Sequence, residues 1–236
     1  MKLDLPPGAD LDWTATLKPV RRIDLWWQHL DVAEARFAAL LSDHERRWAD
    51  RFRSAVDRRR YIVRRGRLRE LLAAQLNCGV RDVAITYNKF GKPRVEGCDL
   101  KFSLSHAQGM ALYTFARGHE IGCDIEWHSP GFALKDTAKL CLSDRELEAM
   151  RSLPERQWVS AFLSYWTCKE AYLKARGVGF ALSPRAITVA GGELPHFVEL
   201  PDDDPAEWSL VVLDLPAGYV GALAVDGVVP AICYRS

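Results

Sequence analysis

Residues 121–127 read IGCDIEW, which alternates apolar residues with small or acidic ones and therefore predicts a β-strand with one buried face. Because successive side chains of a strand point to opposite faces, Asp124 and Glu126 share a face with Gly122, and their Cα atoms lie about 7 Å apart. Two carboxylates this close repel each other unless a cation lies between them or one is protonated. Such a pair of oxygen ligands suits magnesium. The alternative is a solvent-facing strand with two ordinary acids.

A long helix is predicted over residues 155–176, where glycine at position 177 ends it. Within it, residues 162–174 read FLSYWTCKEAYLK. Glu170 and Lys174 are one turn apart and lie beside the apolar ridge of this helix, not opposite it. Such a pair is usually a surface ion pair. The functional interpretation is a third carboxylate for the metal, followed by an ammonium that neutralises charge on a phosphate.

Three weaker signals precede these motifs. Residues 45–70 hold eleven arginines and four acids, and a subset facing one cleft could bind phosphates through two hydrogen bonds each. The turn Gly91-Lys92-Pro93 presents a cation but lacks the spacing of a phosphate-binding P-loop. Ser105-His106 ends an apolar stretch, and a histidine there is either structural or a phosphate donor or base.

The composition bounds the class of protein. The chain has 236 residues, 48% of them hydrophobic and 27% charged, with a net charge of +1, which excludes a disordered chain and a polycation. No apolar run approaches the length of a membrane span, so we expect a cytoplasmic protein. Because no C-x-x-C pair occurs, we expect free thiols. The six cysteines are Cys78, Cys98, Cys123, Cys141, Cys168 and Cys233.

Helices and short strands mix irregularly along the chain, which favours the α+β class. The order of elements suggests two similar halves, residues 1–118 with the Arg-rich helix and 119–236 with the carboxylates and the Lys-Glu helix. The further predicted elements are strands at 23–27 and 83–87, helices at 31–41, 134–140 and 143–150, a capping-box helix after Ser42 and Glu45, an Arg-rich helix ending near 77–79, a hairpin of 111–116 with 120–127, and short strands over 186–234.

Taken in order, these motifs resemble the Sfp-type 4′-phosphopantetheinyl transferases. The resemblance runs from about Arg53 to Gly179, over half of the chain, and its last two motifs at their mutual distance are the most specific. The motifs stand here as Gly91-Lys92-Pro93, Ser105-His106, Gly122-Cys123-Asp124-Ile125-Glu126 and Trp166-Thr167-Cys168-Lys169-Glu170-Ala171-Tyr172-Leu173-Lys174.

The resemblance implies transfer of phosphopantetheine from coenzyme A to a serine of an apo acyl or peptidyl carrier protein, with release of adenosine 3′,5′-bisphosphate. It also implies a monomer whose two similar halves form a pseudo-dimer. The implied residues are Asp124, Glu126 and Glu170 for magnesium, Lys174 for the α-phosphate or the leaving group, Lys92, Ser105 and His106 for coenzyme A, and Glu146 as a further acid. The resemblance assigns no residue to the 3′-phosphate of coenzyme A, for which we choose Arg53 and Arg60, with Arg64 behind them. The base that takes the serine proton is left open between Glu170, Glu146 and a metal-bound hydroxide.

Two departures from the family pattern stand out. Cys123 replaces the usual Ile or Val, which affects packing alone, and Glu45 and Trp48 stand where some relatives present lysines to the nucleotide.

Two alternative functions remain. A magnesium-dependent nuclease would use the same acids and lysine, but would leave the GKP and SH motifs without a role. An RNA-binding module would use the Arg-rich helix, although the net charge is only +1 and no aromatic stacking motif is present. We therefore expect neither a nucleic-acid partner nor a membrane partner.

Overall fold

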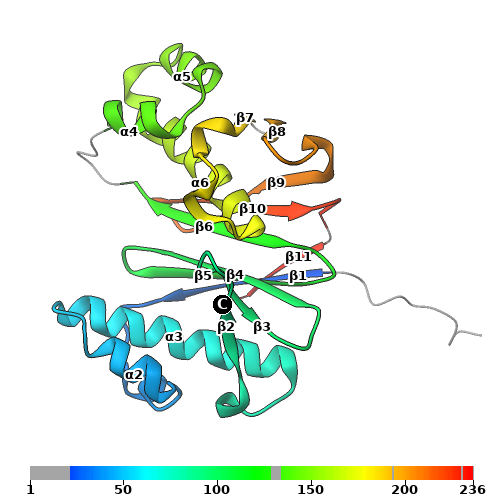
Figure 1. Cartoon of the computed structure of the whole chain (residues 1–236). Coiled ribbons are helices and arrows are strands. Elements are labelled where there is room, and N and C mark those ends of the chain that lie inside the picture. The colour runs from blue at the N-terminus through cyan, green and yellow to red at the C-terminus, as the bar shows by residue number, and fades with distance from the viewer. Residues whose placement is uncertain (1–21, 129–133, 193, 230, 236) are drawn as a thin grey trace, which may run out of the picture.

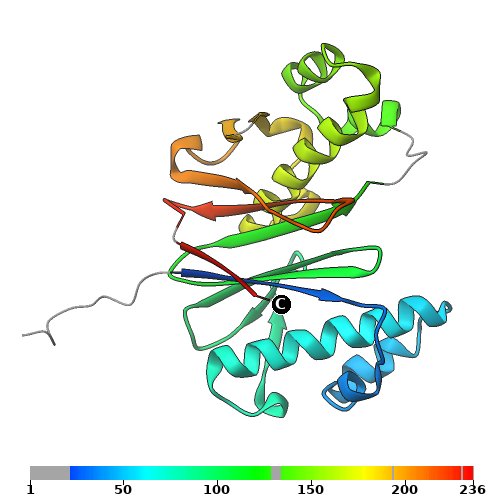
Figure 2. The same ribbon diagram turned by 180° about the vertical axis from the view of Figure 1, so that it is seen from behind.

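Two β-sheets stacked face to face form the centre of the molecule, and helices cover the outer face of each sheet (Figures 1 and 2). The computed structural model describes residues 22–128, 134–192, 194–229 and 231–235. The first sheet consists of β1 (Arg22–His29), β4 (Leu100–Ala107), β5 (Met110–Arg117) and β11 (Ala231–Arg235). Its order is β11-β1-β5-β4, with β11 parallel to β1 and the other neighbours antiparallel.

The second sheet is antiparallel and has the order β6-β10-β9. It consists of β6 (Ile121–Trp127), β9 (Trp208–Val212) and β10 (Tyr219–Asp226). The pairing β6-β10-β9 repeats that of β1-β5-β4 within the first sheet. In each set of three, the first strand in sequence pairs with the last, and the last pairs with the one before it. Two short hairpins lie outside these sheets, β2 (Ile85–Tyr87) with β3 (Pro93–Val95) and β7 (Thr188–Ala190) with β8 (His196–Glu199).

The helices form the two outer layers (Figure 1). The first sheet is covered by α3 (Ala55–Leu76), with α1 (Ala35–Ala38) and α2 (Asp43–Ala49) beside it. The second sheet is covered by α6 (Trp158–Arg176), with α4 (Leu134–Cys141) and α5 (Asp144–Arg151) at its far end. Single turns of 3₁₀-helix occur at Val80–Asp82, Glu155–Gln157, Gly179–Ala181, Pro184–Ala186 and Pro205–Glu207.

Local sequence signals set several helix ends. Ser42 begins α2 through a capping box with Glu45, as predicted, and Ser143 begins α5 in the same way. Gly177 ends α6 in the left-handed conformation, with φ of 63°, which glycine adopts at little cost.

The alternation predicted for residues 121–127 is confirmed. Ile121, Cys123 and Ile125 are at most 1% exposed and pack into the core between the two sheets. The opposite face of β6 lies under α6 and not in solvent, because Asp124 is only 3% exposed. The alternative of a solvent-facing strand with two ordinary acids is therefore wrong for Asp124.

The α+β class is confirmed, but the predicted hairpin of 111–116 with 120–127 is wrong. Both strands exist, yet β5 pairs with β1 and β4, whereas β6 pairs with β10 in the other sheet. Both edges of β5 are occupied, so the chain crosses from one sheet to the other after Arg117.

The predicted helix at 31–41 is a single turn, α1. Asp31 bonds instead to Arg60, and Phe37 packs against Gly66 of α3, so tertiary contacts decide this segment. The predicted division at 118 falls between β5 and β6, although β11 joins the sheet of β1. All six cysteines are free thiols, as predicted. Among the described helices, none is both long and apolar enough to cross a bilayer.

Candidate active site

A buried carboxylate, Asp124, lies where β4, β6 and α6 meet. Its Oδ1 atom accepts hydrogen bonds from Ser105 Oγ at 2.7 Å and from Lys174 Nζ at 2.6 Å. Lys174 Nζ also donates to Ser105 Oγ at 2.8 Å, so side chains from three elements bond to one another. Asp124 Oδ2 is buried and has no hydrogen-bond partner among the described residues. One buried oxygen of this carboxylate is thus free to accept a ligand.

Gly122 explains why α6 packs so closely against β6. A Cβ atom on Gly122 would overlap the carbonyl oxygen of Ala171 and the backbone nitrogen of Ala175. Only glycine leaves the helix room to pack directly on the strand. This close packing brings Glu170 and Lys174, the helical neighbours of Ala171 and Ala175, to the Asp124 side of the strand.

Glu126 lies two residues along the same face and is half-buried. Its Oε1 atom accepts a hydrogen bond from Trp166 Nε1 at 3.1 Å, and Trp166 stacks on Phe162. Burial raises the pKa of Glu126, and the negative charge of Asp124 raises it further. The two acids of the motif therefore interact, as their spacing predicts.

Glu170 completes the set of acids. Its Oε1 atom is buried and has no hydrogen-bond partner among the described residues. Burial raises the pKa of Glu170 to about 7, with a further contribution from the charge of Asp124. For Lys174, burial works against the charged form, but the Asp124 carboxylate outweighs it and raises the pKa of the ammonium. Lys174 therefore pairs with Asp124 and not with Glu170, its neighbour one turn away.

The three carboxylates have the chemistry of a site for a hard divalent cation. They are oxygen donors, two of their buried oxygens lack partners, and burial together with their mutual repulsion raises the pKa values of Glu126 and Glu170. Within the described ranges, however, no three His, Cys, Asp or Glu side chains converge closely enough to hold a metal ion. The Lys174 ammonium neutralises Asp124 in this arrangement.

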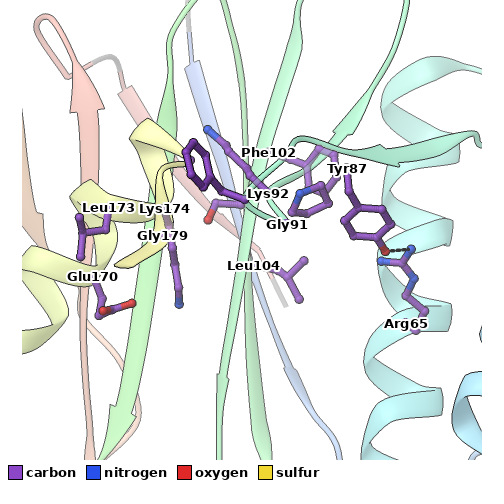
Figure 3. A pocket seen from close by; sticks show the side chains of 14 residues that line it. Arg65, Tyr87, Gly91, Lys92, Phe102, Leu104, Glu170, Leu173, Lys174 and Gly179 are labelled. Carbon is purple, nitrogen blue, oxygen red and sulfur yellow. Dashed lines mark hydrogen bonds between the residues drawn. The ribbon is translucent and has the colours of Figure 1, made fainter. Parts of the chain in front are cut away.

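A cavity of about 360 Å³ opens beside this cluster, between α6 and α3 (Figure 3). Glu170 and Lys174 lie at one end, Arg65 lies on the α3 side, and Leu104 lies between them. Arg65 is held by Glu45 and donates to Tyr87 Oη at 2.8 Å. Apolar side chains form much of the wall, which suits a flat or apolar ligand with a charged end. These side chains are Tyr87, Phe90, Phe102, Leu104 and Leu173.

Lys92, in the GKP turn, lines the same cavity with its stem but directs its ammonium elsewhere. Lys92 Nζ donates to Glu120 Oε2 at 2.9 Å and to the carbonyl oxygen of Ala175 at 2.5 Å. Burial lowers the pKa of Lys92, although the Glu120 carboxylate opposes this shift.

A second cavity, of about 270 Å³, gathers three of the predicted cofactor contacts, Arg60, Arg64 and His106. Asp31 holds Arg60 through two hydrogen bonds of 2.8 and 2.7 Å. Burial lowers the pKa of Arg64, whose guanidinium lies 5.8 Å from the centre of the Tyr61 ring. His106 is exposed, yet the protein atoms around its ring desolvate the charged imidazolium and lower the pKa of His106 to about 4. The positive charges of Arg64 and Lys174 add to this shift. The cavity therefore presents the Arg64 guanidinium and a neutral imidazole at pH 7, while Arg60 is paired with Asp31 and Asp57 also lines the wall.

Two predicted site residues lie apart from these groups. Arg53 is exposed in the segment before α3 and lines neither cavity. Glu146 is 1% exposed, and its Oε2 lies 2.5 Å from Lys169 Nζ. Its two oxygens also accept hydrogen bonds from the backbone nitrogens of Ser143 and Val189, each at 2.8 Å. Among the described residues, no hydrogen bond or ion pair joins Glu146 to the acids of the site.

Sequence reasoning missed Asp31, Asn88 and the part played by Arg65. Asp31 and Asn88 are isolated polar residues outside any motif, and only the fold brings them to Arg60 and to the end of α6. For Arg65, the sequence offered one signal: Arg65 lies four residues before Arg69 and therefore on the same face of the helix. In the structure, both arginines bind the buried Glu45.

Comparison with known proteins gives a consistent result. Residues 120–224 match the model of the family described as the 4′-phosphopantetheinyl transferase superfamily. The 4′-phosphopantetheinyl transferase HetI of Nostoc sp. (strain PCC 7120) is 38% identical over 213 residues, covering 87% of this chain and 88% of that protein. The 4′-phosphopantetheinyl transferase Sfp of Bacillus subtilis (strain 168) is 25% identical over 171 residues, covering 71% and 74%.

Solved structures align over about half of the chain. The holo-[acyl-carrier-protein] synthase of Neisseria meningitidis covers 46% of this chain and 98% of its own, at 23% identity and a TM-score of 0.38. A holo-(acyl-carrier-protein) synthase of Bacillus anthracis, solved in complex with coenzyme A (3′,5′-ADP), covers 46% of this chain and 96% of its own, at 20% identity and a TM-score of 0.40.

Proposed function

The chain belongs to the 4′-phosphopantetheinyl transferase superfamily, and from this premise we propose a role for each residue of its site. The protein transfers 4′-phosphopantetheine from coenzyme A to a serine of an apo carrier protein. The serine oxygen bonds to the phosphorus that carries pantetheine, and the bond from that phosphorus to the remaining phosphate breaks. Adenosine 3′,5′-bisphosphate leaves. Because negative charge builds on phosphate oxygens, catalysis depends on cations held in place more than on a covalent intermediate.

One observation carries the assignment of the reaction centre. The buried Asp124 carboxylate bonds to Lys174 and Ser105, and Glu170 stands beside it at the end of a cavity of about 360 Å³. Lys174 is the cation placed to hold the charge that develops on the diphosphate. Asp124 keeps that ammonium charged and fixes its position.

The oxygen donors of Asp124, Glu126 and Glu170 suit magnesium. These residues would hold it once their side chains lie closer together than they do in this arrangement. When bound, the ion supplies positive charge that neutralises the phosphate oxygens and orients the diphosphate. The unpartnered oxygens on Asp124 and Glu170 support this proposal, since a buried carboxylate oxygen without a partner is costly in the absence of a cation.

The nucleotide end of coenzyme A belongs with Arg60, Arg64 and His106. Two guanidiniums can bind a phosphate with paired hydrogen bonds, and a neutral imidazole can donate one more. Ser105 links this pocket to the reaction centre, because it precedes His106 on β4 and bonds to Asp124. Lys92 contributes its stem to the wall of the larger cavity. Arg53 stays a prediction for the 3′-phosphate.

Glu170 is the carboxylate we assign to take the serine proton, with the one of its two oxygens that does not hold magnesium. Glu146, the other acid considered, has both oxygens engaged by Lys169 and two backbone nitrogens. A residue so occupied cannot accept a proton without breaking its own ion pair. Glu170 Oε1 has no such partner among the described residues.

The repeated pairing in the two sheets supports a pseudo-dimer. The elements before and after Gly118 follow the same order, and β1-β5-β4 matches β6-β10-β9. We propose that one chain supplies both halves of the site and acts as a monomer in the cytoplasm. The first half carries Arg60, Arg64 and His106, and the second carries the acids and Lys174.

The structure favours neither alternative function. An RNA-binding helix needs free cations, yet the described arginines of α3 are largely paired with acids. The paired arginines are Arg58, Arg59, Arg60, Arg65, Arg67 and Arg69. A nuclease would give no reason for the second cavity, which gathers Arg60, Arg64 and His106.

The test is the intact mass of an apo carrier protein after incubation with this protein, coenzyme A and magnesium, beside a sample with EDTA. We expect a gain of one phosphopantetheine that EDTA abolishes. No gain with acyl and peptidyl carriers alike would overturn the function. A gain that EDTA leaves unchanged would overturn the metal proposal alone.

A further inference from the structure

The end of α6 is capped by side chains from a distant part of the sequence. A helix leaves its last carbonyl groups without intrahelical partners, and helix ends fray. Here the carbonyl oxygen of Ala175 accepts from Lys92 Nζ at 2.5 Å. The carbonyl oxygen of Gly177 accepts from Asn88 Nδ2 at 2.7 Å. An ammonium at this end also complements the negative pole of the helix.

The amide oxygen of Asn88 and the backbone of Lys92 are held in the β2-β3 turn. Asn88 Oδ1 accepts hydrogen bonds from the backbone nitrogens of Phe90 and Lys92, each at 2.9 Å. Lys92 Nζ also bonds to Glu120, just before β6, at 2.9 Å. Asn88 therefore closes its turn with one atom of its amide and caps α6 with the other.

Gly177 makes this contact possible. A Cβ atom there would lie 2.5 Å from Lys92 Cδ and 3.1 Å from Asn88 Nδ2, and its φ of 63° disfavours other residues. The turn and the helix end therefore pack without space between them.

We propose that Asn88 and Lys92 are positioning residues that strap the end of α6 to the first half of the molecule. This inference rests on the transferase function stated above. The strapped turn of α6 carries Lys174, whose ammonium must stay within 2.6 Å of Asp124. A misplacement of about 1 Å, even from a change far from the chemistry, can cost about 100-fold in rate. The Lys92 ammonium thus serves catalysis through the helix and does not itself bind the phosphates of coenzyme A.

Two substitutions isolate the strap. Asn88→Asp keeps the oxygen that closes the turn but replaces the donor to Gly177 with an oxygen. Lys92→Met keeps the apolar stem in the cavity wall and removes the ammonium. The matched control is Arg94→Met, on the same hairpin, because Arg94 is 60% exposed and bonds to Glu96 alone among the described residues.

The measurements are kcat and KM for coenzyme A with a carrier protein, and amide hydrogen exchange over residues 171–177. We expect each strap variant to lower kcat by about tenfold or more and to change the KM for coenzyme A by less than about threefold. Exchange at the end of α6 should become about tenfold faster. The double variant should lose less than the product of the single effects, because both act on one helix end. Arg94→Met should match the wild type.

Two results would overturn the strap. One is a Lys92→Met variant with an unchanged kcat and a raised KM, which would make the ammonium a direct ligand. The other is unchanged exchange at residues 171–177 in both variants. Because hydrogen exchange needs no turnover, it tests the strap even if the wild type fails to modify any carrier.

Discussion

Glu146→Gln removes the negative charge from a buried ion pair that joins α5 to α6. Glu146 Oε2 lies 2.5 Å from Lys169 Nζ, and the two side chains are 1% and 0% exposed. The Ser143 and Val189 backbone nitrogens donate to different oxygens of Glu146, so the glutamine oxygen can serve only one of them. Its NH2 group faces the other donor, and the glutamine cannot neutralise the ammonium. The variant therefore buries a lysine without a counter-ion.

The expected loss of stability follows from that unpaired charge. Breaking a buried pair by removing one partner costs about 3–5 kcal/mol. Lys169 keeps the carbonyl oxygens of Cys141 and Pro184, at 2.9 and 3.0 Å, so we expect about 3 kcal/mol, at the lower end of this range. Burial already lowers the pKa of Lys169. Between the lowered pKa of folded Lys169 and the ordinary lysine pKa, the unfolded chain binds more protons than the folded protein. Losing Glu146 lowers the folded pKa further, so the destabilisation should shrink as the pH rises through this window toward about 10.

The assay is urea unfolding of the wild type, Glu146→Gln, and the double variant Glu146→Gln/Lys169→Met. The double variant should be more stable than Glu146→Gln, because no unpaired charge stays buried. At a temperature where Glu146→Gln is folded, kcat should fall by less than about tenfold, whereas loss of a general base costs about 10²–10⁴-fold. A change in stability below about 1 kcal/mol, or a kcat loss of about 100-fold in the folded variant, would refute the structural role of Glu146.

Two further predictions concern Gly122 and His106. Gly122→Ala should destabilise the fold by about 1–3 kcal/mol in urea unfolding and lower kcat, because its Cβ pushes α6 away from β6; wild-type values for both would mean that close packing is dispensable. The His106 imidazole should titrate near pH 4 by NMR. Between about pH 6.5 and 4 the unfolded chain then binds more protons than the folded protein, so stability should fall as the pH falls. The pKa of His106 should rise when adenosine 3′,5′-bisphosphate binds. A midpoint near 6.5 in the free protein would contradict the crowding of His106 by Arg64 and surrounding atoms.

Local patterns predicted the elements of this fold better than their partners. The alternation in 121–127, the capping box at Ser42 and the glycine after α6 are short-range signals, and each is confirmed. Strand pairing is not local. The partner of β6 is β10, about 100 residues later, and no spacing near Gly118 distinguishes that pairing from a hairpin.

In the site, too, local positions were predicted better than long-range contacts. The motifs located the acids and Lys174, because residues two or four apart share a face of a strand or helix. They did not reveal that Lys174 pairs with Asp124 and not with Glu170, or that Lys92 caps α6. Those contacts depend on how closely α6 packs on β6, which a single glycine decides.

The most direct test of the central claim is the extent of carrier modification by Asp124→Ala, measured by intact mass with coenzyme A and magnesium. The variant's folded state is checked by its unfolding transition. Asp124 anchors Lys174 and offers the unpartnered oxygen, so we expect no phosphopantetheine on the carrier from a folded variant, under conditions where the wild type modifies it fully. Wild-type rates of modification by folded Asp124→Ala would contradict the assignment of this cluster as the reaction centre.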